Sequence, residues 1–278
     1  MTYREALEYG DKKLSESGIA EHKKDGELLL LFITGKDRTF VLTHGDESEL
    51  TPGEEEGYKE LILKRGKHIP LQLLTGCTDF MGLDFKVSDK VLIPRIDTEF
   101  LVEEALKYIN NGASILDMCC GSGCILLSLM KYRNDIDGTG ADISHYALSL
   151  SRENAERLGI NSAVFIESDL FSAVEGSFDH IVCNPPYIRS ADIGGLMEEV
   201  RCHEPVNALD GGEDGLEFYR RVAADAWEHL NGGGHIFFEI GYDQGEDVSC
   251  ILKDAGYKNI KVIKDYSGNE RVVICSKS

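Results

Sequence analysis

Hydrophobic residues in the amino-terminal part of the chain recur every three to four positions, as they do along one face of a helix. Helix-start patterns agree with this spacing, because Thr2 with Glu5, and Thr51 followed by Pro52 and Glu54, place capping side chains where a helix would begin. The spacing predicts helices over 3–17, 20–33 and 52–64. Because these helices have apolar faces, we expect them to pack into a small helical bundle.

The pattern changes at Ile69, where short extended runs punctuated by Gly76 and Gly82 end at Arg95, as is typical of a β-hairpin. Further along, apolar runs of strand length alternate with helical patterns, which indicates an α/β fold. Strands are predicted at 113–118, 138–141, 163–166, 178–182, 235–240, 260–263 and 271–275, and helices at 98–108, 124–132, 215–230 and up to 255. We therefore predict a helical domain over 1–75, a hairpin linker over 76–94 and an α/β domain over 95–278.

Three polar side chains lie at the ends of predicted strands. Asp117 is at the end of the first strand, Asp142 follows the second, and Asn184 follows the fourth. In an open α/β sheet, ligands bind in the crevice beyond the carboxyl ends of the strands. The three side chains are therefore expected to converge on one site.

The turn after the first strand is rich in small residues, so a ligand can approach its backbone. It reads Asp117-Met118-Cys119-Cys120-Gly121-Ser122-Gly123. Asp142 stands where a carboxylate accepts the two ribose hydroxyls in dinucleotide-binding folds, which predicts a nucleoside ligand. The dinucleotide fingerprint fails, because Leu126 occupies the position of its third glycine. S-adenosylmethionine, a nucleoside ligand without phosphate, fits better, and Asp117 would then face its amino group. A turn that needs glycine only for its backbone is the alternative interpretation.

The third predicted strand is followed by Glu167-Ser168-Asp169-Leu170-Phe171. An acid beside apolar residues at this position would bind an adenine amino group and cover the ring, which makes Asp169 and Leu170 candidate contacts. A helix cap at Ser168 or Asp169 explains the same residues equally well.

The fourth predicted strand is followed by Asn184-Pro185-Pro186-Tyr187. Each proline fixes its own φ and favours an extended conformation in the residue before it, so the carbonyls here are rigid. If the Asn184 side-chain oxygen and the Pro185 carbonyl accept the two N–H groups of a planar nitrogen, and Tyr187 packs on its flat face, the nitrogen is held ready for methylation. The alternative is an ordinary Pro-Pro turn capped by Asn184.

The composition bears on partners and compartment. The chain carries 49 acidic and 29 basic residues, for a net charge of −20, which disfavours a nucleic-acid partner bound through its phosphates. The eight cysteines include no C-x-x-C pair and no companion histidines at zinc spacing, so we expect reduced thiols in a cytoplasm and no metal site. The longest aliphatic run, 28–33, is too short to span a membrane, and the charged amino terminus has no export pattern.

Several motifs together resemble the HemK-type protein-glutamine methyltransferases, which modify the glutamine of the Gly-Gly-Gln motif in bacterial peptide chain release factors. The resemblance covers nearly the whole chain. Its most specific match is Ile93-Pro94-Arg95-x-x-Thr98-Glu99, whereas the Asn-Pro-Pro-Tyr tetrapeptide is shared with several nitrogen methyltransferases. Other matching positions are Pro70-Leu71-Gln72, Phe80-Met81-Gly82, Glu204-Pro205, Gly215-Leu216 and Glu239-Ile240-Gly241 with Gln244.

The resemblance implies a fold and a set of site residues. The fold is a helical domain on a seven-stranded, Rossmann-like class I methyltransferase domain whose last strand runs antiparallel. By the resemblance, S-adenosylmethionine is held by Cys119, Cys120, Gly121, Ser122 and Gly123, with its ribose on Asp142, its adenine beside Leu170, and the substrate amide in the clamp from Asn184 to Tyr187. Two departures from the family stand out. Cys119 replaces a glycine of many members, so we expect its φ to be negative, and Leu170 replaces an aromatic residue of some members.

The resemblance thus implies an S-adenosylmethionine-dependent protein-(glutamine-N5) methyltransferase that acts on release factors. We expect a monomer that makes no direct contact with nucleic acid. One alternative is a nucleic-acid methyltransferase acting on an adenine or guanine amino group, but such enzymes flip the base and bring a basic groove, which this sequence lacks. The other is a methyltransferase-like module that only binds a partner, which would be expected to have lost Asn184 or Asp142.

Overall fold

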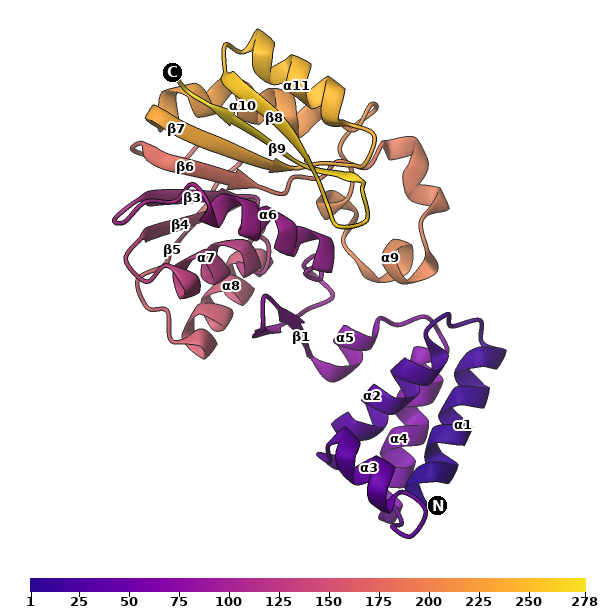
Figure 1. Cartoon of the computed structure of the whole chain (residues 1–278). Helices are drawn as coiled ribbons and strands as arrows, with labels where there is room; N and C mark the ends of the chain where they lie inside the picture. Colours follow the sequence, from indigo (N-terminus) through magenta and orange to yellow (C-terminus); the bar gives the residue numbers. More distant parts are fainter. The chain divides into compact units, whose positions relative to one another are not determined.

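A computed structural model describes every residue from Met1 to Ser278, and the chain forms two compact units (Figure 1). The first unit comprises Met1–Gly76 and Met197–His203, and the second comprises Cys77–Leu196 and Glu204–Ser278. The chain therefore passes from one unit to the other at 76–77, 196–197 and 203–204.

The first unit is a bundle of helices. They are α1 (Tyr3–Glu16), α2 (His22–Thr34), α3 (Arg38–His44), α4 (Pro52–Arg65), α5 (Leu71–Thr75) and α9 (Glu198–His203). Both predicted capping boxes are present, one at the start of α1 and the other at the start of α4. Apolar faces of the helices enclose a core that includes Leu14, Leu29 and Tyr58. The sequence pattern missed α3, α5 and α9, because helices of 7, 5 and 6 residues are too short to show a helical period. In the second unit it also missed α8, which has 14 residues.

The second unit combines a β-hairpin with a seven-stranded sheet and its covering helices. The hairpin strands are β1 (Cys77–Phe80) and β2 (Leu83–Lys86), and the sheet strands are β3 (Ser114–Met118), β4 (Asp137–Asp142), β5 (Val164–Glu167), β6 (Phe178–Cys183), β7 (Leu230–Glu239), β8 (Lys258–Lys264) and β9 (Glu270–Ser276). The helices are α6 (Ile96–Leu106), α7 (Cys124–Tyr132), α8 (His145–Leu158), α10 (Glu217–His229) and α11 (Gly245–Asp254), with short 3-10 helices η1 (Ser190–Gly195) and η2 (Val206–Ala208).

The sheet has the strand order β5-β4-β3-β6-β7-β9-β8. Neighbours from β5 to β7 pair in parallel, whereas β9 pairs antiparallel with both β7 and β8. This confirms the predicted seven-stranded fold and its antiparallel last strand. The direction of strand addition reverses between β3 and β6, so their carboxyl ends form the topological switch point at which doubly wound sheets bind ligands.

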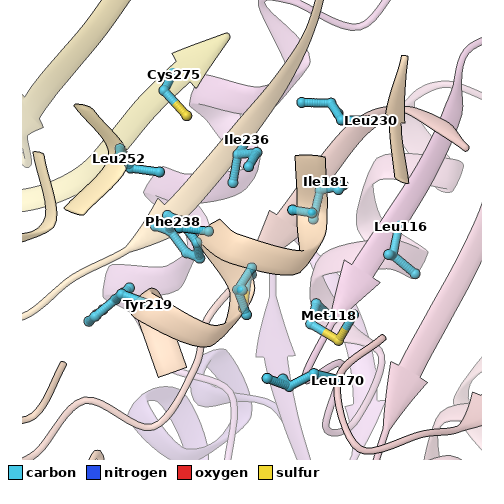
Figure 2. Close-up of a cluster of buried hydrophobic side chains, with 14 of the residues drawn as sticks. Leu116, Met118, Leu170, Ile181, Tyr219, Leu230, Ile236, Phe238, Leu252 and Cys275 are labelled. Carbon is cyan, nitrogen blue, oxygen red and sulfur yellow. The ribbon is translucent and has the colours of Figure 1, made fainter. Parts of the chain in front are cut away.

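Alternate residues of the central strands supply two separate cores. On one face, Leu116, Ile181 and Phe238 pack with residues of α10 and α11, such as Tyr219 and Leu252 (Figure 2). On the other face, residues one position along each strand pack with α6 and α7; these are Ile115, Val182 and Phe237. Burial of each large apolar side chain stabilises the folded state by roughly 1.5–3 kcal/mol. The two cores therefore hold the central strands, and the residues at their ends, in fixed positions.

The two units differ from the predicted domains in two places. The hairpin groups with the sheet instead of forming a separate linker, and 197–203 groups with the amino-terminal helices although it lies inside the predicted α/β domain. Neither assignment follows from local sequence, because both depend on contacts with residues distant in the chain. None of the helices has the length and apolar character needed to cross a membrane.

Candidate functional site

A cavity of about 320 Å³ lies at the carboxyl ends of β3, β4 and β6 in the second unit. Its volume falls in the range of small-molecule sites. Of the predicted site residues, those that line it are Cys119, Cys120, Gly121, Ser122, Asp142, Asp169, Leu170, Asn184 and Pro186. The strand ends that the sequence brings together therefore do share one cavity.

The turn between β3 and α7 uses left-handed backbone at three residues. Gly121 has a φ of 54° and Gly123 a φ of 78°. A Cβ on Gly123 would lie 3.1 Å from Ser151 Oγ, so a larger residue would also have to displace a neighbour. The prediction that Cys119 keeps a negative φ is wrong, because its φ is 62°. The tight turn holds this residue in a backbone region that its side chain makes costly.

Leu170 has the same unusual backbone in another part of the cavity wall, with a φ of 50°. The Ser168 hydroxyl donates to the Leu170 carbonyl at 2.5 Å and accepts from the Ala173 N–H at 3.0 Å, which fixes this bend. The residues after Ser168 form turns and no helix, so the helix-cap interpretation is wrong. Cys119 and Leu170, the two residues at which the sequence departs from the family that it resembles, therefore both lie in the cavity wall in strained backbone.

Asp142 ends β4 and presents a fixed carboxylate to the cavity. Its Oδ2 accepts the Gly121 N–H and its Oδ1 accepts the Ser144 N–H, both at 2.9 Å. Burial raises the pKa of Asp142, while the backbone N–H groups oppose that rise. Each carboxylate oxygen can accept more than one hydrogen bond. The carboxylate can therefore still accept two hydroxyl groups from a ligand.

Asp117 lies behind the turn, outside the cavity wall. Its side chain is fully buried, its Oδ2 accepts the Leu126 N–H at 3.1 Å, and its Oδ1 has no hydrogen-bond partner. Burial raises the pKa of Asp117 to about 8, and the charge of Asp142 adds to the rise. Gly123 also lies outside the wall. Their visible role is to shape the turn, and their contact with a ligand stays a prediction.

The cationic side chains around the cavity are compensated by carboxylates. Arg95 Nη2 lies 2.6 and 2.7 Å from the two oxygens of Glu204, and Arg221 Nη2 lies 2.7 Å from Asp169 Oδ1. Lys90 Nζ lies 4.0 Å from the carboxylate of the preceding residue. The cavity thus offers no uncompensated set of cations for a phosphate group, which suits a phosphate-free nucleoside.

Asn184 follows β6, and its side chain has a defined direction. Its Nδ2 donates to Thr98 Oγ1 at 3.2 Å, which leaves Oδ1 to accept a hydrogen bond from a ligand. Pro186 lines the cavity beside it, whereas Pro185 is buried outside the wall. The arrangement can hold a donor group of a substrate amide at the cavity edge. Acceptance of a second N–H by the Pro185 carbonyl stays a prediction.

Tyr187 supports the tetrapeptide from the interior. Its hydroxyl donates to Glu239 Oε1 at 3.4 Å, and its ring packs against the core beneath the site. Burial raises the pKa of this hydroxyl well above its usual value. Because Tyr187 lies outside the cavity wall, its predicted stacking on a substrate amide also stays a prediction.

Sequence reasoning assigned no role to Thr98, Glu204 or Glu239, although all three stand in matching motifs. The structure places Thr98 against Asn184, Glu204 against Arg95, and Glu239 against Tyr187. A carboxylate at the end of an apolar strand is the signal that singled out Asp142. The same signal is present at Glu239, which ends β7.

Two family models match this chain. The PrmC N-terminal domain matches residues 5–76, and the methyltransferase small domain matches residues 95–203. The first match falls on the helical unit, and the second includes the strands that form the cavity.

Curated relatives match over the full length. The release factor glutamine methyltransferase of Clostridium acetobutylicum is 40% identical over 99% of this chain and 98% of its own length. The proteins of the same name from Geobacter sulfurreducens and Clostridium botulinum are also 40% identical; they cover 98% and 100% of this chain, and 95% and 100% of their own lengths.

Solved structures share the fold over about seven-tenths of this chain. A methyltransferase from Pyrococcus furiosus is 23% identical with a TM-score of 0.55, over 71% of this chain and 90% of its own. A Thermus thermophilus 16S rRNA methyltransferase, solved with AdoMet and guanosine, is 16% identical with a TM-score of 0.51, over 73% of this chain and 50% of its own. These likenesses show the fold alone, so substrate choice has to be argued from the site.

Proposed function

We propose, since this chain belongs to the family of release factor glutamine methyltransferases, that it transfers a methyl group to the N5 side-chain amide nitrogen of the Gly-Gly-Gln glutamine in peptide chain release factors. The observation that carries the proposal is the fixed amide of Asn184 at the edge of a nucleoside-sized cavity.

The donor is S-adenosylmethionine. When bound, it supplies an electrophilic methyl group carried on a sulfonium sulfur. Asp142 would accept the ribose hydroxyls, because its carboxylate is held toward the cavity by two backbone N–H groups. The small residues Cys119 to Ser122 let a ligand lie against the backbone, and Leu170 offers an apolar surface for the adenine. The absence of an uncompensated cation suits a ligand without phosphate.

The substrate glutamine is held by its own amide group. A planar amide nitrogen is a weak nucleophile, because its lone pair is delocalised into the carbonyl. Acceptance of one N–H by Asn184 Oδ1, and of the other by the Pro185 carbonyl, would fix the plane of the amide and raise the share of reactive geometries. These acceptors also favour the transition state, in which the N–H groups become more acidic.

The same reasoning supports a protein substrate over a nucleic acid. A net charge of −20 opposes binding that depends on neutralised phosphates. We further propose that the enzyme works in the cytoplasm, which agrees with its eight free cysteines, and that it acts as a monomer.

The test incubates labelled S-adenosylmethionine with a purified release factor or with total RNA. Wild type is expected to label the release factor. Asn184→Asp should lower turnover by roughly 10² or more without weakening donor affinity, because the charge stabilises the bound cationic donor more than the transition state. Asp142→Ala should instead weaken donor binding at least tenfold by calorimetry, given about 1.5–3 kcal/mol per charge-assisted hydrogen bond. Label in RNA, or wild-type turnover by Asn184→Asp, would refute the proposal.

A further inference from the structure

Glu239 is a buried carboxylate with a free acceptor position. It ends β7, and its residue is 2% exposed. Its Oε1 accepts a hydrogen bond from the Tyr187 hydroxyl at 3.4 Å, while its Oε2 has no hydrogen-bond partner. Burial raises its pKa to about 7, and the Thr98 hydroxyl opposes that rise as a hydrogen-bond donor. Burying a carboxylate without full hydrogen bonding costs free energy. A functional role would explain why Glu239 is kept at this buried position.

Thr98 connects this carboxylate to the site. Its side chain, on α6, is 2% exposed, and its Oγ1 accepts from Asn184 Nδ2 at 3.2 Å. The same hydroxyl is close enough to Glu239 to lower the pKa of that carboxyl as a hydrogen-bond donor. A hydroxyl carries one proton. If that proton points to Glu239, the side of Oγ1 that faces Asn184 can only accept a hydrogen bond.

The direction of the series of hydrogen bonds that runs from Asn184 through Thr98 to Glu239 is set by the Glu239 carboxylate. An ionised carboxylate can only accept hydrogen bonds, so Glu239 makes the Thr98 hydroxyl a donor toward it. Thr98 must then accept from Asn184, and the Asn184 amide must turn its Nδ2 inward. Its Oδ1 is left at the cavity. The oxygen and nitrogen of an Asn amide have almost the same shape, so packing alone does not select this orientation.

We propose that Glu239 is a positioning residue that acts through Thr98 to fix the orientation of the Asn184 amide, so that Oδ1 and not Nδ2 faces the substrate amide. This inference rests on the proposed function, because it gives Asn184 Oδ1 its substrate. If the amide turned over, Nδ2 would meet the donor N–H groups of the glutamine, and no hydrogen bond could form.

Other charged and titratable groups face Glu239 from the elements packed around it. Arg271 on β9 favours its ionised form, whereas Asp97 on α6 opposes it. Tyr219 on α10 donates its hydroxyl to the backbone carbonyl of Glu239, at 2.9 Å, and not to its carboxylate. Cys124 on α7 is also near enough for the Glu239 charge to raise the pKa of its thiol.

The decisive variants change the direction of the hydrogen bonds while keeping the shape. Glu239→Gln adds an N–H₂ group that can donate to Thr98, so the Thr98 hydroxyl can donate to Asn184 and the amide can turn over. Thr98→Val removes the hydroxyl, and Thr98→Ser keeps it. Tyr219→Phe is the matched control, because it removes a buried hydroxyl beside Glu239 that takes no part in the series.

Turnover of a release factor is measured for each variant between pH 6 and 8.5, with donor affinity measured by calorimetry. Glu239→Gln and Thr98→Val are expected to lower kcat roughly 10- to 100-fold, while the donor Kd stays within about twofold of the wild-type value. Thr98→Ser, which keeps the hydroxyl, should have a kcat close to that of wild type. In wild type, kcat should rise with pH as Glu239 ionises, and this rise should be absent in Glu239→Gln. Tyr219→Phe should keep both the wild-type kcat and its pH profile.

A second measurement needs neither donor nor substrate. The side-chain N–H₂ resonances of Asn184, observed by NMR in the free protein, should shift in Glu239→Gln and Thr98→Val but not in Tyr219→Phe. Wild-type kcat and unchanged Asn184 resonances in Glu239→Gln would overturn the inference. If Asn184→Asp were inactive at the same time, the proposed function would stand without it. Failure of wild type to methylate a release factor would instead count against the proposed function, and the NMR result would still decide the orientation.

Discussion

At the scale of single residues, two residues with strained backbone lie in the cavity wall. Cys119 and Leu170 both have left-handed backbone, and both lie in the wall. Such a conformation costs a residue with a side chain about 1–3 kcal/mol. It persists at Cys119 because the surrounding turn is fixed by backbone hydrogen bonds, among them the Cys120 N–H to the Ala141 carbonyl at 3.1 Å. The turn keeps the shape that a glycine would give it.

This strain predicts an inverted order of stability at Cys119. Glycine is normally less stable than alanine, but in left-handed backbone the order reverses. Cys119→Gly should therefore be more stable than Cys119→Ala by about 1 kcal/mol, as measured by urea unfolding. Cys250, exposed on α11, is the matched control, and there Ala should exceed Gly by about 1 kcal/mol. The same order at both positions would contradict a strained turn.

Single residues also mark what the sequence could reveal about the site. Asp142 and Asn184 were found because a polar residue at the end of an apolar strand is a local signal. The left-handed φ of Cys119 was missed, because a cysteine gives no local sign of it and the turn around it decides. The inward position of Tyr187 and the link from Asn184 to Thr98 depend on residues distant in sequence.

At the scale of elements, β6 and β7 hold an uncommon pair. His180 and His235 are directly paired in register, with ring centroids 5.4 Å apart, and Nδ1 of each has no hydrogen-bond partner. Burial and repulsion from His235 together lower the pKa of His180 to about 4, while Asp179 opposes the shift. Burial lowers the pKa of His235 too, with help from the charge of Lys261. Both rings are therefore held neutral in the folded sheet.

The pair predicts loss of stability in acid. The unfolded pKa of histidine is about 6.5, so the unfolded state binds more protons between pH 6.5 and 4. The stabilisation is full above pH 6.5 and is lost as pH falls toward 4, by about 3 kcal/mol for His180 at 1.36 kcal/mol per pKa unit. Urea unfolding at several pH values should show a shallower acid slope in His180→Phe, while His145→Gln, at an exposed position, should keep the wild-type slope. An unchanged slope in His180→Phe would show that other groups cause the loss.

Helices and strands were predictable where apolar residues recurred with a single helical or strand spacing. Strand β3 was predicted within one residue, because its apolar run is bounded by turn residues. Strand β7 begins at Leu230, five positions before the predicted start at 235, since Asn231-Gly232-Gly233-Gly234 reads as a loop. Pairing with its neighbours, including the Gly233 N–H to the Lys277 carbonyl at 2.8 Å, outweighs that local preference.

At the scale of the whole molecule, a short segment from the middle of the chain belongs to the amino-terminal helices. Arg65, only 4% exposed, is its anchor. Its Nε lies 2.8 Å from Asp25 Oδ2, its Nη2 lies 2.6 Å from Glu199 Oε1 on α9, and its Nη1 donates to the Ile69 carbonyl at 3.2 Å. Arg65 thus joins α9 to α2 within the first unit. Of the residues that follow α9, Pro205, Asn207 and Ala208 line the cavity.

The anchor predicts how α9 and the helical unit depend on Arg65. Arg65→Met keeps the aliphatic bulk but leaves the buried Asp25 without its cation, which should destabilise the helical unit by about 3–5 kcal/mol. The control Glu199→Gln keeps the shape and an acceptor, and since that side chain is 32% exposed, it should cost about 1 kcal/mol or less. Hydrogen exchange should therefore accelerate strongly in α9 and α2 of Arg65→Met, weakly in α9 of Glu199→Gln, and not in β3 or β6 of either variant. If the α9 amides exchanged at the wild-type rate in Arg65→Met while α2 accelerated, Arg65 would stabilise the helical bundle without holding α9.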